Sequence, residues 1–453
     1  MAWLVHRFPL NFDCRMRDSV TNALSQTFGI LKNHTWYAQK SIQETPMITV
    51  TYARLEAPVA QKQLMKDFFV VSADSHVNEP FDLWLTRIDA KFRDRVPRIE
   101  VDEKGRKWFV VEGFRKSIIR EAPRDEQVSV DEFQERSNSA GYRMELDRTK
   151  GAMFQQRGNP SADRYADMDY DGVDAEILFP NKGLTNWSSP DPAMHVAMCR
   201  VYNDWVHEVF AGSSRTFPTA CVAPADISAC VAEIERVAKL GFHSVTMPPL
   251  VTGGKGYNLP DYDPVWSALE ETGMPVCFHA GTGKDPRTAT GDGGAIINYV
   301  VHAMNTVLEP TVQLCASGVF DRHPKLRFAT IEAGAGWVPY ALFAMDEGFR
   351  KHAFWVSPKL KDKPSEYFKR HGHASFQEDP IGVELRHLLG IDSLLWGNDY
   401  PHIEGTWPYS DDVTSKLMAE LTKEEKAKIV GLNAASLFNI DVPAQFRRPS
   451  TTH

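Results

Sequence analysis

Short apolar runs alternate with longer amphipathic segments from residue 68 onward. Runs of this kind, rich in β-branched and aromatic residues, are typical of buried strands. The pattern predicts strands at Phe68–Asp74, Ala175–Pro180, Thr219–Ala223, Ser244–Met247, Pro275–His279, Leu326–Glu332, Gly372–Phe376 and Leu394–Asn398.

The segments between these runs have the periodicity of amphipathic helices. In ISACVAEIERVAKLG the apolar positions recur every three or four residues, and Gly241 is a stop signal. Eight strands that alternate with helices belong to the α/β class. This number of strands favours a closed (β/α)8 TIM barrel over a doubly wound sheet, which usually has fewer strands. The predicted helices are Met194–Gly212, Ser228–Leu240, Tyr262–Thr272, Ala303–Phe320 and Pro339–Phe354.

Three segments depart from this rhythm. Residues 1–66 are weakly periodic, and we interpret them as an N-terminal extension. This extension is either a flexible arm or a segment upstream of the true start of the protein. Residues 80–170 form an insertion in the barrel domain 67–440, with a β-hairpin that turns at Lys104–Gly105. An insertion after the first strand projects from the catalytic face of a barrel, as a lid, a partner contact or a simple loop. Residues 441–453 form a polar tail.

Composition narrows the class of protein. The chain has 453 residues, 43% of them hydrophobic, and a net charge of −8. The sequence contains no run of 18 apolar residues, so it predicts no membrane span. The net negative charge argues against a nucleic-acid partner. Six dispersed cysteines are typical of reduced thiols. We therefore expect a cytoplasmic protein that acts on a small molecule, and a homodimer, the commonest assembly.

Residues of metal-ligand type follow several predicted strands. The first strand ends in Asp74-Ser75-His76, and residues two apart in an extended segment face the same side. His279 ends the fifth strand, and Asp399 follows the eighth. Taken alone, each is more often a helix cap or a structural histidine than a ligand. Together, two imidazoles and two carboxylates at one barrel rim predict a divalent metal site.

Glu332 stands at the same rim, after the run LRFATI. Alternation along that run places Glu332, Thr330 and Phe328 on one side, which we expect to be the barrel axis. We interpret Glu332 as a metal ligand, a bridge between two metals or a general base. The alternative is a helix-start carboxylate before a glycine turn.

Other histidines receive a lesser role. His302 follows the fifth strand in a helical pattern, NYVVHAMNTVLEP, and either reaches the metal from above or packs in the interior. His402, three residues after Asp399, is a candidate for contact with the substrate during catalysis. Four other histidines are interpreted as structural: His195, His207, His243 and His323.

These motifs resemble the amidohydrolase superfamily, in the branch that contains aminocarboxymuconate-semialdehyde decarboxylase. The resemblance runs from about Val70 to Ile440. It departs from the family at two positions: Asp74-x-His76 replaces the usual His-x-His or Glu-x-His, and Glu332 replaces a histidine of the decarboxylases. The segments that carry it are VVSADSHVNEP, CVAPADISACVAEIERVAKLGFHSVTMPP, DYDPVWSALEETGMPVCFHAG, SGVFDRHPKLRFATIEAGAGWVPYALFAMDE, LLWGNDYPHIEGTWP and GLNAASLFNI.

The resemblance implies a metal-dependent enzyme, and the Glu332 departure favours hydrolysis. Metal-activated water would attack a small organic acid or cyclic compound, with Asp399 handling the proton and Glu332 assisting. Two alternatives keep the site: non-oxidative decarboxylation of an aromatic or unsaturated acid, and oxygen activation at a non-haem iron or diiron centre. A non-catalytic binding protein is the last alternative. The expected cofactor is one or two ions of zinc, iron or manganese. Substrate contacts are expected in the insertion and near it, from Arg143, Arg148 or Trp187.

Overall fold

The computed structural model describes residues 65–119, 158, 160, 162–251, 255–283, 289–356, 360–402 and 405–446. The predicted extension lies outside this range up to residue 64, and so does the tail from residue 447. The larger part of the insertion lies outside it too, including Arg143 and Arg148. Within the described residues, no helix has the length and apolar character needed to cross a membrane.

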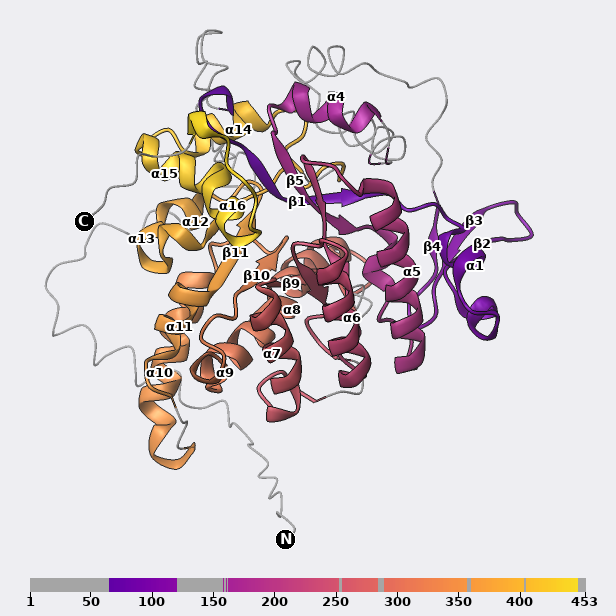
Figure 1. The fold of residues 1–453 in the computed structure, drawn as a ribbon, viewed down its shortest axis with the longest axis horizontal. Helices are drawn as coiled ribbons and strands as arrows, with labels where there is room; N and C mark the ends of the chain where they lie inside the picture. Colours follow the sequence, from indigo (N-terminus) through magenta and orange to yellow (C-terminus); the bar gives the residue numbers. More distant parts are fainter. Residues whose placement is uncertain are drawn as a thin grey trace, which may run out of the picture. The chain divides into compact units, whose positions relative to one another are not determined.

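A closed ring of parallel strands organises the chain (Figure 1). Two sheets contribute to it, ordered β1-β5-β6 and β7-β8-β9-β10-β11-β12. They meet at Thr219 between β6 and β7, and a bridge between Ser75 and Tyr400 joins β1 to the segment after β12. The predicted (β/α)8 barrel is therefore confirmed. The strands are β1 (Val71–Val77), β5 (Ala175–Pro180), β6 (Thr216–Pro218), β7 (Ala220–Cys221), β8 (Val245–Met247), β9 (Val276–His279), β10 (Phe328–Ile331), β11 (Gly372–Phe376) and β12 (Leu394–Trp396).

The third barrel strand differs from its prediction. The run predicted as one strand, Thr219–Ala223, starts earlier and is divided in two. Glu176 in β5 pairs with Thr216, whereas Ala220 pairs with Val245 in β8. The strand changes partner at Thr219, and the two sheets join there.

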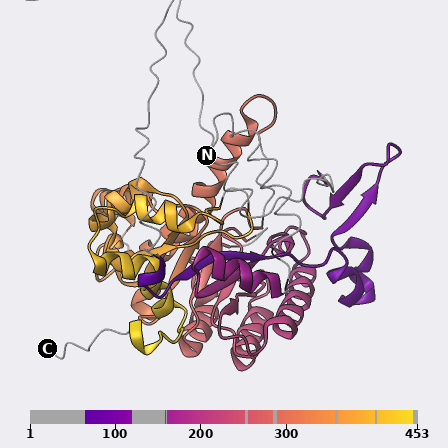
Figure 2. The same cartoon turned by 90° about the horizontal axis from the view of Figure 1, so that it is seen from above.

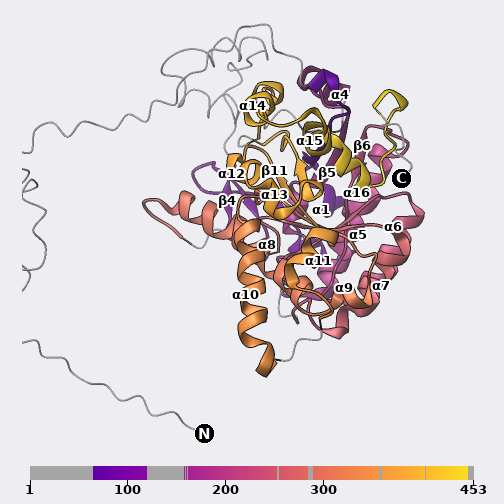
Figure 3. The same cartoon turned by 90° about the vertical axis from the view of Figure 1, so that its left-hand side faces the viewer.

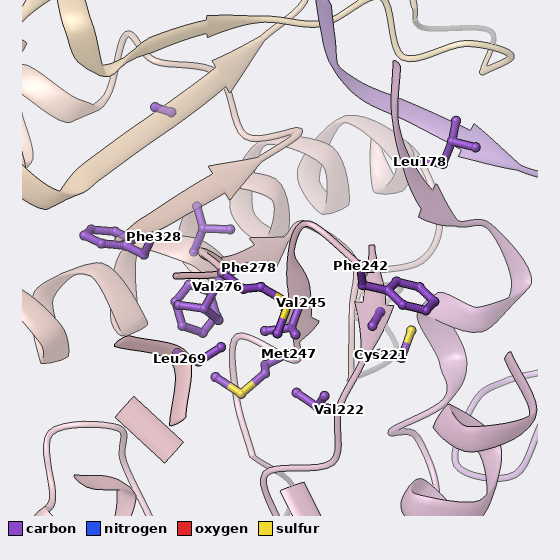
Figure 4. Close-up of a cluster of buried hydrophobic side chains, with 14 of the residues drawn as sticks. Leu178, Cys221, Val222, Phe242, Val245, Met247, Leu269, Val276, Phe278 and Phe328 are labelled. Carbon is purple, nitrogen blue, oxygen red and sulfur yellow. The ribbon is translucent and has the colours of Figure 1, made fainter. Parts of the chain in front are cut away.

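Helices cover the outer side of the ring, and the apolar faces of both elements form the core between them. Phe278 and Phe328 project outward from β9 and β10 into this layer, which Figure 4 shows around β8 and β9. Alternate residues such as Cys277, Ala329 and Ile331 fill the inside of the ring. The covering helices are α5 (Pro192–Phe210), α6 (Ile227–Lys239), α7 (Asp263–Thr272), α8 (Gly294–Ala316), α9 (Val319–Arg322), α10 (Val338–Val356), α11 (Pro364–His371), α12 (Pro380–Glu384) and α13 (Arg386–Leu389).

The C-terminal residues form two helical segments, as the sequence predicts. The first is α14 (Ser410–Leu417). The second begins at α15 (Lys423–Ala427), passes through a π-helical turn, and ends in α16 (Asn433–Leu437). Leu437 and Phe438 pack with Val71 and Ala73 of β1, so this segment closes one end of the ring.

The described part of the insertion contains a small antiparallel sheet that stands clear of the barrel (Figure 2). β2 (Arg98–Val101) pairs with β3 (Lys107–Val110), which confirms the predicted hairpin, and β4 (Ser117–Ile118) adds a third strand. Two helical elements precede this sheet, α1 (Leu83–Arg87) and η2 (Ala90–Arg95). α4 (Ala162–Asp171) then leads back to β5.

Candidate metal centre

Two histidine side chains meet at the C-terminal end of the ring. His76 in β1 and His279 in β9 are both fully buried. Nδ1 of His76 lies 3.0 Å from the carbonyl oxygen of Pro180, and Nδ1 of His279 lies 2.8 Å from that of Ala280. Since a carbonyl oxygen only accepts hydrogen bonds, both Nδ1 atoms carry the proton, and both Nε2 atoms present lone pairs.

These lone pairs lie beside buried carboxylates. The two Nε2 atoms are 3.3 Å apart, and Asp74 Oδ1 lies 3.6 Å from Nε2 of His76 and 3.5 Å from Nε2 of His279. Asp399 Oδ1 lies 3.3 Å from Nε2 of His76. Within the described part of the chain, Asp74 Oδ1 and both carboxylate oxygens of Asp399 accept no hydrogen bond, although they are buried.

This arrangement fits a divalent cation. Unprotonated imidazole nitrogens and carboxylate oxygens are all electron-rich, and burying them together is costly unless a positive charge lies between them. Burial and the nearby His402 lower the pKa of His76 to about 4, so His76 is neutral at physiological pH and does not supply that charge. The ligand atoms of Asp74, His76 and His279 lie within 4.8 Å of one another, as one bound ion requires.

A break in strand regularity aims the first two ligands. The register of β1 against β5 pairs Ser72 with Glu176 but Ser75 with Leu178, so β1 carries one extra residue between these pairs. Such a bulge reverses which side chains face inward. Val71 and Ala73 fill the inside of the ring before the bulge, and His76 points inward after it.

Asp399 is held by a left-handed backbone. Its φ angle is 55°, a conformation that few residues other than glycine adopt. Its N–H donates to the carbonyl oxygen of Asp74 at 2.8 Å, and the N–H of His76 donates to that of Tyr400 at 2.6 Å. The loop after β12 is thereby fixed to β1, which brings the carboxylates of Asp74 and Asp399 to the same imidazole.

Glu332 reaches the site by a route different from the predicted one. Ala329 and Ile331 face the inside of the ring, and Phe328 packs in the outer layer, so strict alternation would direct Glu332 outward. Instead, a φ angle of 58° turns the residue, and Oε2 lies 3.4 Å from Nδ1 of His279. The expectation that alternation aims Glu332 at the barrel axis was wrong, yet its carboxylate lies beside the metal centre.

The loop after Glu332 is fixed by its neighbours. The N–H of Glu332 donates to Ser375 Oγ at 3.0 Å. Asp379 Oδ2 accepts from the N–H groups of Ala335 and Gly336, each at 2.7 Å. These bonds hold the turn that gives Glu332 its unusual backbone, so the position of the carboxylate is set by β11 and the residues after it.

His402 lies against the metal centre as well. Its Nδ1 is 2.9 Å from Asp399 Oδ1, and its ring lies 3.9 Å from that of His76. Burial raises the pKa of Asp399, but the His402 and His76 imidazoles outweigh burial and hold it below its ordinary value. Asp399 is therefore ionised at neutral pH, and its nearest neighbour able to carry a proton is His402.

A buried polar network supports the Asp399 loop from outside. Asn398 Oδ1 accepts from Ser72 Oγ and Ser75 Oγ, both at 3.0 Å, and Asn398 Nδ2 donates to Asp171 Oδ2 at 3.0 Å. The next residue, Tyr400, donates its hydroxyl to Asp167 Oδ2 at 2.6 Å. Asp167 and Asp171 both belong to α4, so the end of the insertion contacts the metal-bearing loop.

Sequence reasoning missed some residues of this region. Gln377 Nε2 donates to Asp74 Oδ2 at 3.3 Å, and the Phe179 ring lies 5.0 Å from that of His279. Both lie at or directly after a strand end, GHASFQ and AEILFP, which is the signal that would have identified them.

The other histidines and Trp187 can now be placed. His323 lies near Asp263 and Glu270 before β10, away from the metal centre, and Nε2 of His195 contacts the carbonyl oxygen of Ser189. Trp187 is buried and donates to the carbonyl oxygen of Val222 at 2.8 Å, and its contact with the substrate stays a prediction. The side chain of His302, in α8, lies outside the described residues.

Comparison with known proteins places the chain in a family. The family model described as Amidohydrolase matches residues 123–440. The chain belongs to the amidohydrolase family. It is thus an enzyme of the superfamily of metal-dependent hydrolases and carboxy-lyases, as its motifs predict.

The relatives of this amidohydrolase include decarboxylases. It is 27% identical over 291 residues to gamma-resorcylate decarboxylase of Rhizobium sp. (strain MTP-10005), which covers 60% of this chain and 85% of that one. The structure of 5-carboxyvanillate decarboxylase from Sphingomonas paucimobilis matches with a TM-score of 0.58 and 23% identity, over 83% of this chain and 100% of that one.

A further structure was solved with a metal bound. The 5-carboxyvanillate decarboxylase of Novosphingobium aromaticivorans DSM 12444, complexed with manganese and 4-hydroxy-3-methoxy-5-nitrobenzoic acid, matches with a TM-score of 0.55 and 20% identity. The match covers 82% of this chain and 96% of that one. At these identities the structural matches establish the fold of the amidohydrolase alone.

Proposed function

We propose that this amidohydrolase is a metal-dependent, non-oxidative decarboxylase of an aromatic carboxylic acid. This was the alternative to hydrolysis in the sequence-based expectation, and the decarboxylases among its relatives support it. The observation that carries the proposal is the convergence of His76 and His279 Nε2 with the unbonded oxygens of Asp74 and Asp399. In the reaction, an aryl carboxylate and a proton give the arene and carbon dioxide.

Asp74, His76, His279 and Asp399 would hold the cation. When bound, a divalent ion supplies a Lewis acid that binds and orients anionic oxygens of the substrate. Mixed nitrogen and carboxylate ligands suit zinc, manganese or iron, and the manganese bound to a relative makes manganese the first ion to test. Glu332 would serve as an additional ligand or contact a ligand through water, since Oε2 lies near His279.

The Asp399–His402 pair is suited to proton delivery. Decarboxylation of an aryl acid needs a proton at the carbon that loses the carboxylate. His402 Nδ1 lies 2.9 Å from Asp399 Oδ1, so a proton that His402 carries is close to the metal ligands. The side chain of His402 is 13% exposed, whereas that of Asp399 is fully buried, so His402 is the member of the pair that solvent can reprotonate.

The test uses the full chain, freed of metal and then loaded with manganese or zinc. It is incubated with 2,6-dihydroxybenzoate and 5-carboxyvanillate, the acids named for its relatives, and with other hydroxybenzoates. We expect metal-dependent release of carbon dioxide and, in heavy water, one deuterium at the vacated ring carbon. Absence of carbon dioxide release from all of these acids by the metal-loaded protein would contradict the proposal.

Hydrolysis remains the second candidate because of Glu332. It replaces the histidine expected in the decarboxylases that the sequence resembles, and its carboxylate lies where it can accept a proton from water. The substitution Glu332→His separates the two functions. If the protein is a hydrolase, the variant loses hydrolysis. If it is a decarboxylase, the variant retains or gains carbon dioxide release.

A further inference from the structure

The inward side of α4 is polar, whereas the inward side of a covering helix is normally apolar. Among the described residues of this helix, the buried ones are Arg164, Asp167, Met168 and Asp171, at the spacing of one helix face. The helix lies beside β5 and α14 (Figure 3). Arg164 is 1% exposed. A buried charge is costly unless it is paired, so the contacts of Arg164 decide what this side chain does.

The Arg164 guanidinium contacts several separate segments. Nη1 donates to Glu176 Oε2 in β5 at 2.6 Å. Nη2 donates to the backbone carbonyl oxygen of His76 in β1, and to that of Gly158 at 3.2 Å. The guanidinium also lies over the Tyr400 ring, 5.0 Å from its centroid. One side chain of α4 therefore joins β1, β5 and the loop after β12.

These contacts complete the set that holds His76. Its N–H donates to the carbonyl oxygen of Tyr400 at 2.6 Å, and its Nδ1 lies 3.0 Å from the carbonyl oxygen of Pro180. Arg164 donates to the remaining backbone group, the carbonyl oxygen of His76. Because neighbours fix both the backbone and the ring, Nε2 is held toward the position that it shares with Nε2 of His279.

Stability alone does not account for the pair of Arg164 and Glu176. Both side chains are buried, and replacing a buried ion pair by well-packed apolar side chains is often neutral or stabilising. Apolar side chains could fill the same space, but they could not donate a hydrogen bond to the carbonyl oxygen of His76. The position that the ion pair gives to this backbone is what distinguishes it from an apolar contact.

We propose that Arg164 is a positioning residue for the metal ligand His76. Glu176 neutralises its charge, and its second terminal nitrogen holds the backbone of the ligand. Loss of this contact lets the His76 backbone shift, which weakens metal binding without removing any ligand atom. The inference rests on the metal centre of the proposed function, and it is independent of the reaction that the centre catalyses.

The test is the affinity of the full chain for cobalt, titrated against a chelator, together with the visible absorption of the bound ion. Arg164→Lys keeps the positive charge beside Glu176 but replaces the planar fork by a single nitrogen, so the contact to His76 is lost. We expect cobalt affinity to fall by about 10- to 100-fold, the range for lost outer contacts of a metal ligand. The absorption should change as well, because it reports the geometry of the ligands. A role in stability alone would leave it unchanged.

A double variant separates positioning from folding. Arg164→Met combined with Glu176→Leu removes both charges, so no buried charge is left unpaired and the fold should persist. Its cobalt affinity should fall in the same range, since neither new side chain can donate to the carbonyl oxygen of His76. A folded double variant that binds cobalt as tightly as the wild type would contradict the proposal.

Arg327→Lys is the matched control. The Arg327 guanidinium also donates to two backbone carbonyl oxygens, those of Ser436 and Gly273, but it lies directly before β10, away from the metal ligands. Its replacement should leave cobalt affinity and absorption unchanged. Equal weakening in this control, or wild-type affinity in Arg164→Lys, overturns the positioning role alone. A wild-type chain that binds no cobalt overturns the metal centre of the proposed function, and this inference with it.

Discussion

At the scale of single residues, departures from regular strand geometry aim the candidate metal ligands. A bulge in β1 turns His76 inward, and positive φ angles place Glu332 and Asp399. A non-glycine residue in this conformation costs about 1–3 kcal/mol and persists only where its surroundings enforce it. Two such residues at one centre indicate that the fold gives up stability to position these carboxylates.

The histidine ligands provide the first prediction. Replacing His76 or His279 by Ala removes a nitrogen that faces the shared position, and we expect loss of most of the bound metal. The drop in affinity should exceed the about 10- to 100-fold that loss of an outer partner costs. Metal content after reconstitution and desalting is the measurement.

His323→Ala is the matched control for these variants. His323 contacts Asp263 and Glu270 instead of the metal ligands, so its replacement should leave the metal content unchanged. Equal metal loss from all three variants would show that the effect is unfolding and not the loss of a ligand.

The second prediction concerns the charge of Glu332. Glu332→Gln keeps the length of the side chain and the backbone contact to Ser375. If Glu332 is a ligand or lies one water from the metal, turnover should fall by about 100-fold or more, the range of a lost proton-transfer group. Steady-state kinetics and metal content are measured together.

Three results of this experiment have distinct meanings. Metal retained with turnover lost makes Glu332 a proton-handling group. Loss of one of two metals supports a dinuclear centre. Unchanged metal and turnover would remove the carboxylate from the chemistry altogether.

At the scale of elements, much of the barrel was predictable from sequence, because burial imposes a pattern on every strand. The runs at β5 and β11 match their predicted bounds, and both are mostly buried. The convergence of Asp74, His76, His279 and Asp399 followed from strand order alone. The division of the third strand at Thr219 did not, because a change of pairing partner leaves no mark on local hydrophobicity. The route of Glu332 was missed for a related reason: its positive φ is set by contacts with Ser375 in β11 and Asp379 after it, which are distant from Glu332 in the sequence.

The packing of β12 against β1 gives a third prediction. A Cβ added at Gly397 would lie 2.7 Å from Asp74 Cβ and 2.8 Å from Asp74 N, closer than real contacts. Gly397→Ala should therefore displace the Asp74 backbone, lower the free energy of unfolding by about 1–3 kcal/mol and reduce metal affinity. Denaturant titration with and without metal measures both effects.

Gly348→Ala is the comparison for Gly397→Ala. Gly348 lies within α10, and a Cβ there meets nothing within 4 Å. Alanine in a helix interior is favoured over glycine by about 0.5–1 kcal/mol, so this variant should be slightly more stable. If both variants behaved alike, close approach of β12 to β1 would not explain the effect at Gly397.

At the scale of the whole molecule, stability depends on the buried carboxylate of Asp171, which joins segments that are far apart in the sequence. Asp171, in α4, is 4% exposed and accepts hydrogen bonds from Asn398 Nδ2 and from the Ser410 N–H and hydroxyl. Its contacts therefore join the end of the insertion, the Asp399 loop and α14. Burial raises the pKa of Asp171 to about 7, although these hydrogen bonds oppose the shift.

The direction in which stability changes with pH follows from the difference in the pKa of Asp171 between the folded and the unfolded state. A carboxyl group whose pKa is raised from 3.8 in the unfolded chain to about 7 in the native state binds its proton more tightly when folded. Its contribution to stability is fully present below the unfolded pKa, and it is lost as pH rises through the folded pKa.

Asp171→Asn removes the titration. From pH 5 to pH 7 the wild type should lose roughly 2–3 kcal/mol relative to the variant, since each pKa unit is about 1.4 kcal/mol. Denaturant titrations of both proteins in this range measure the difference, and a difference independent of pH would show that Asp171 remains ionised in the fold.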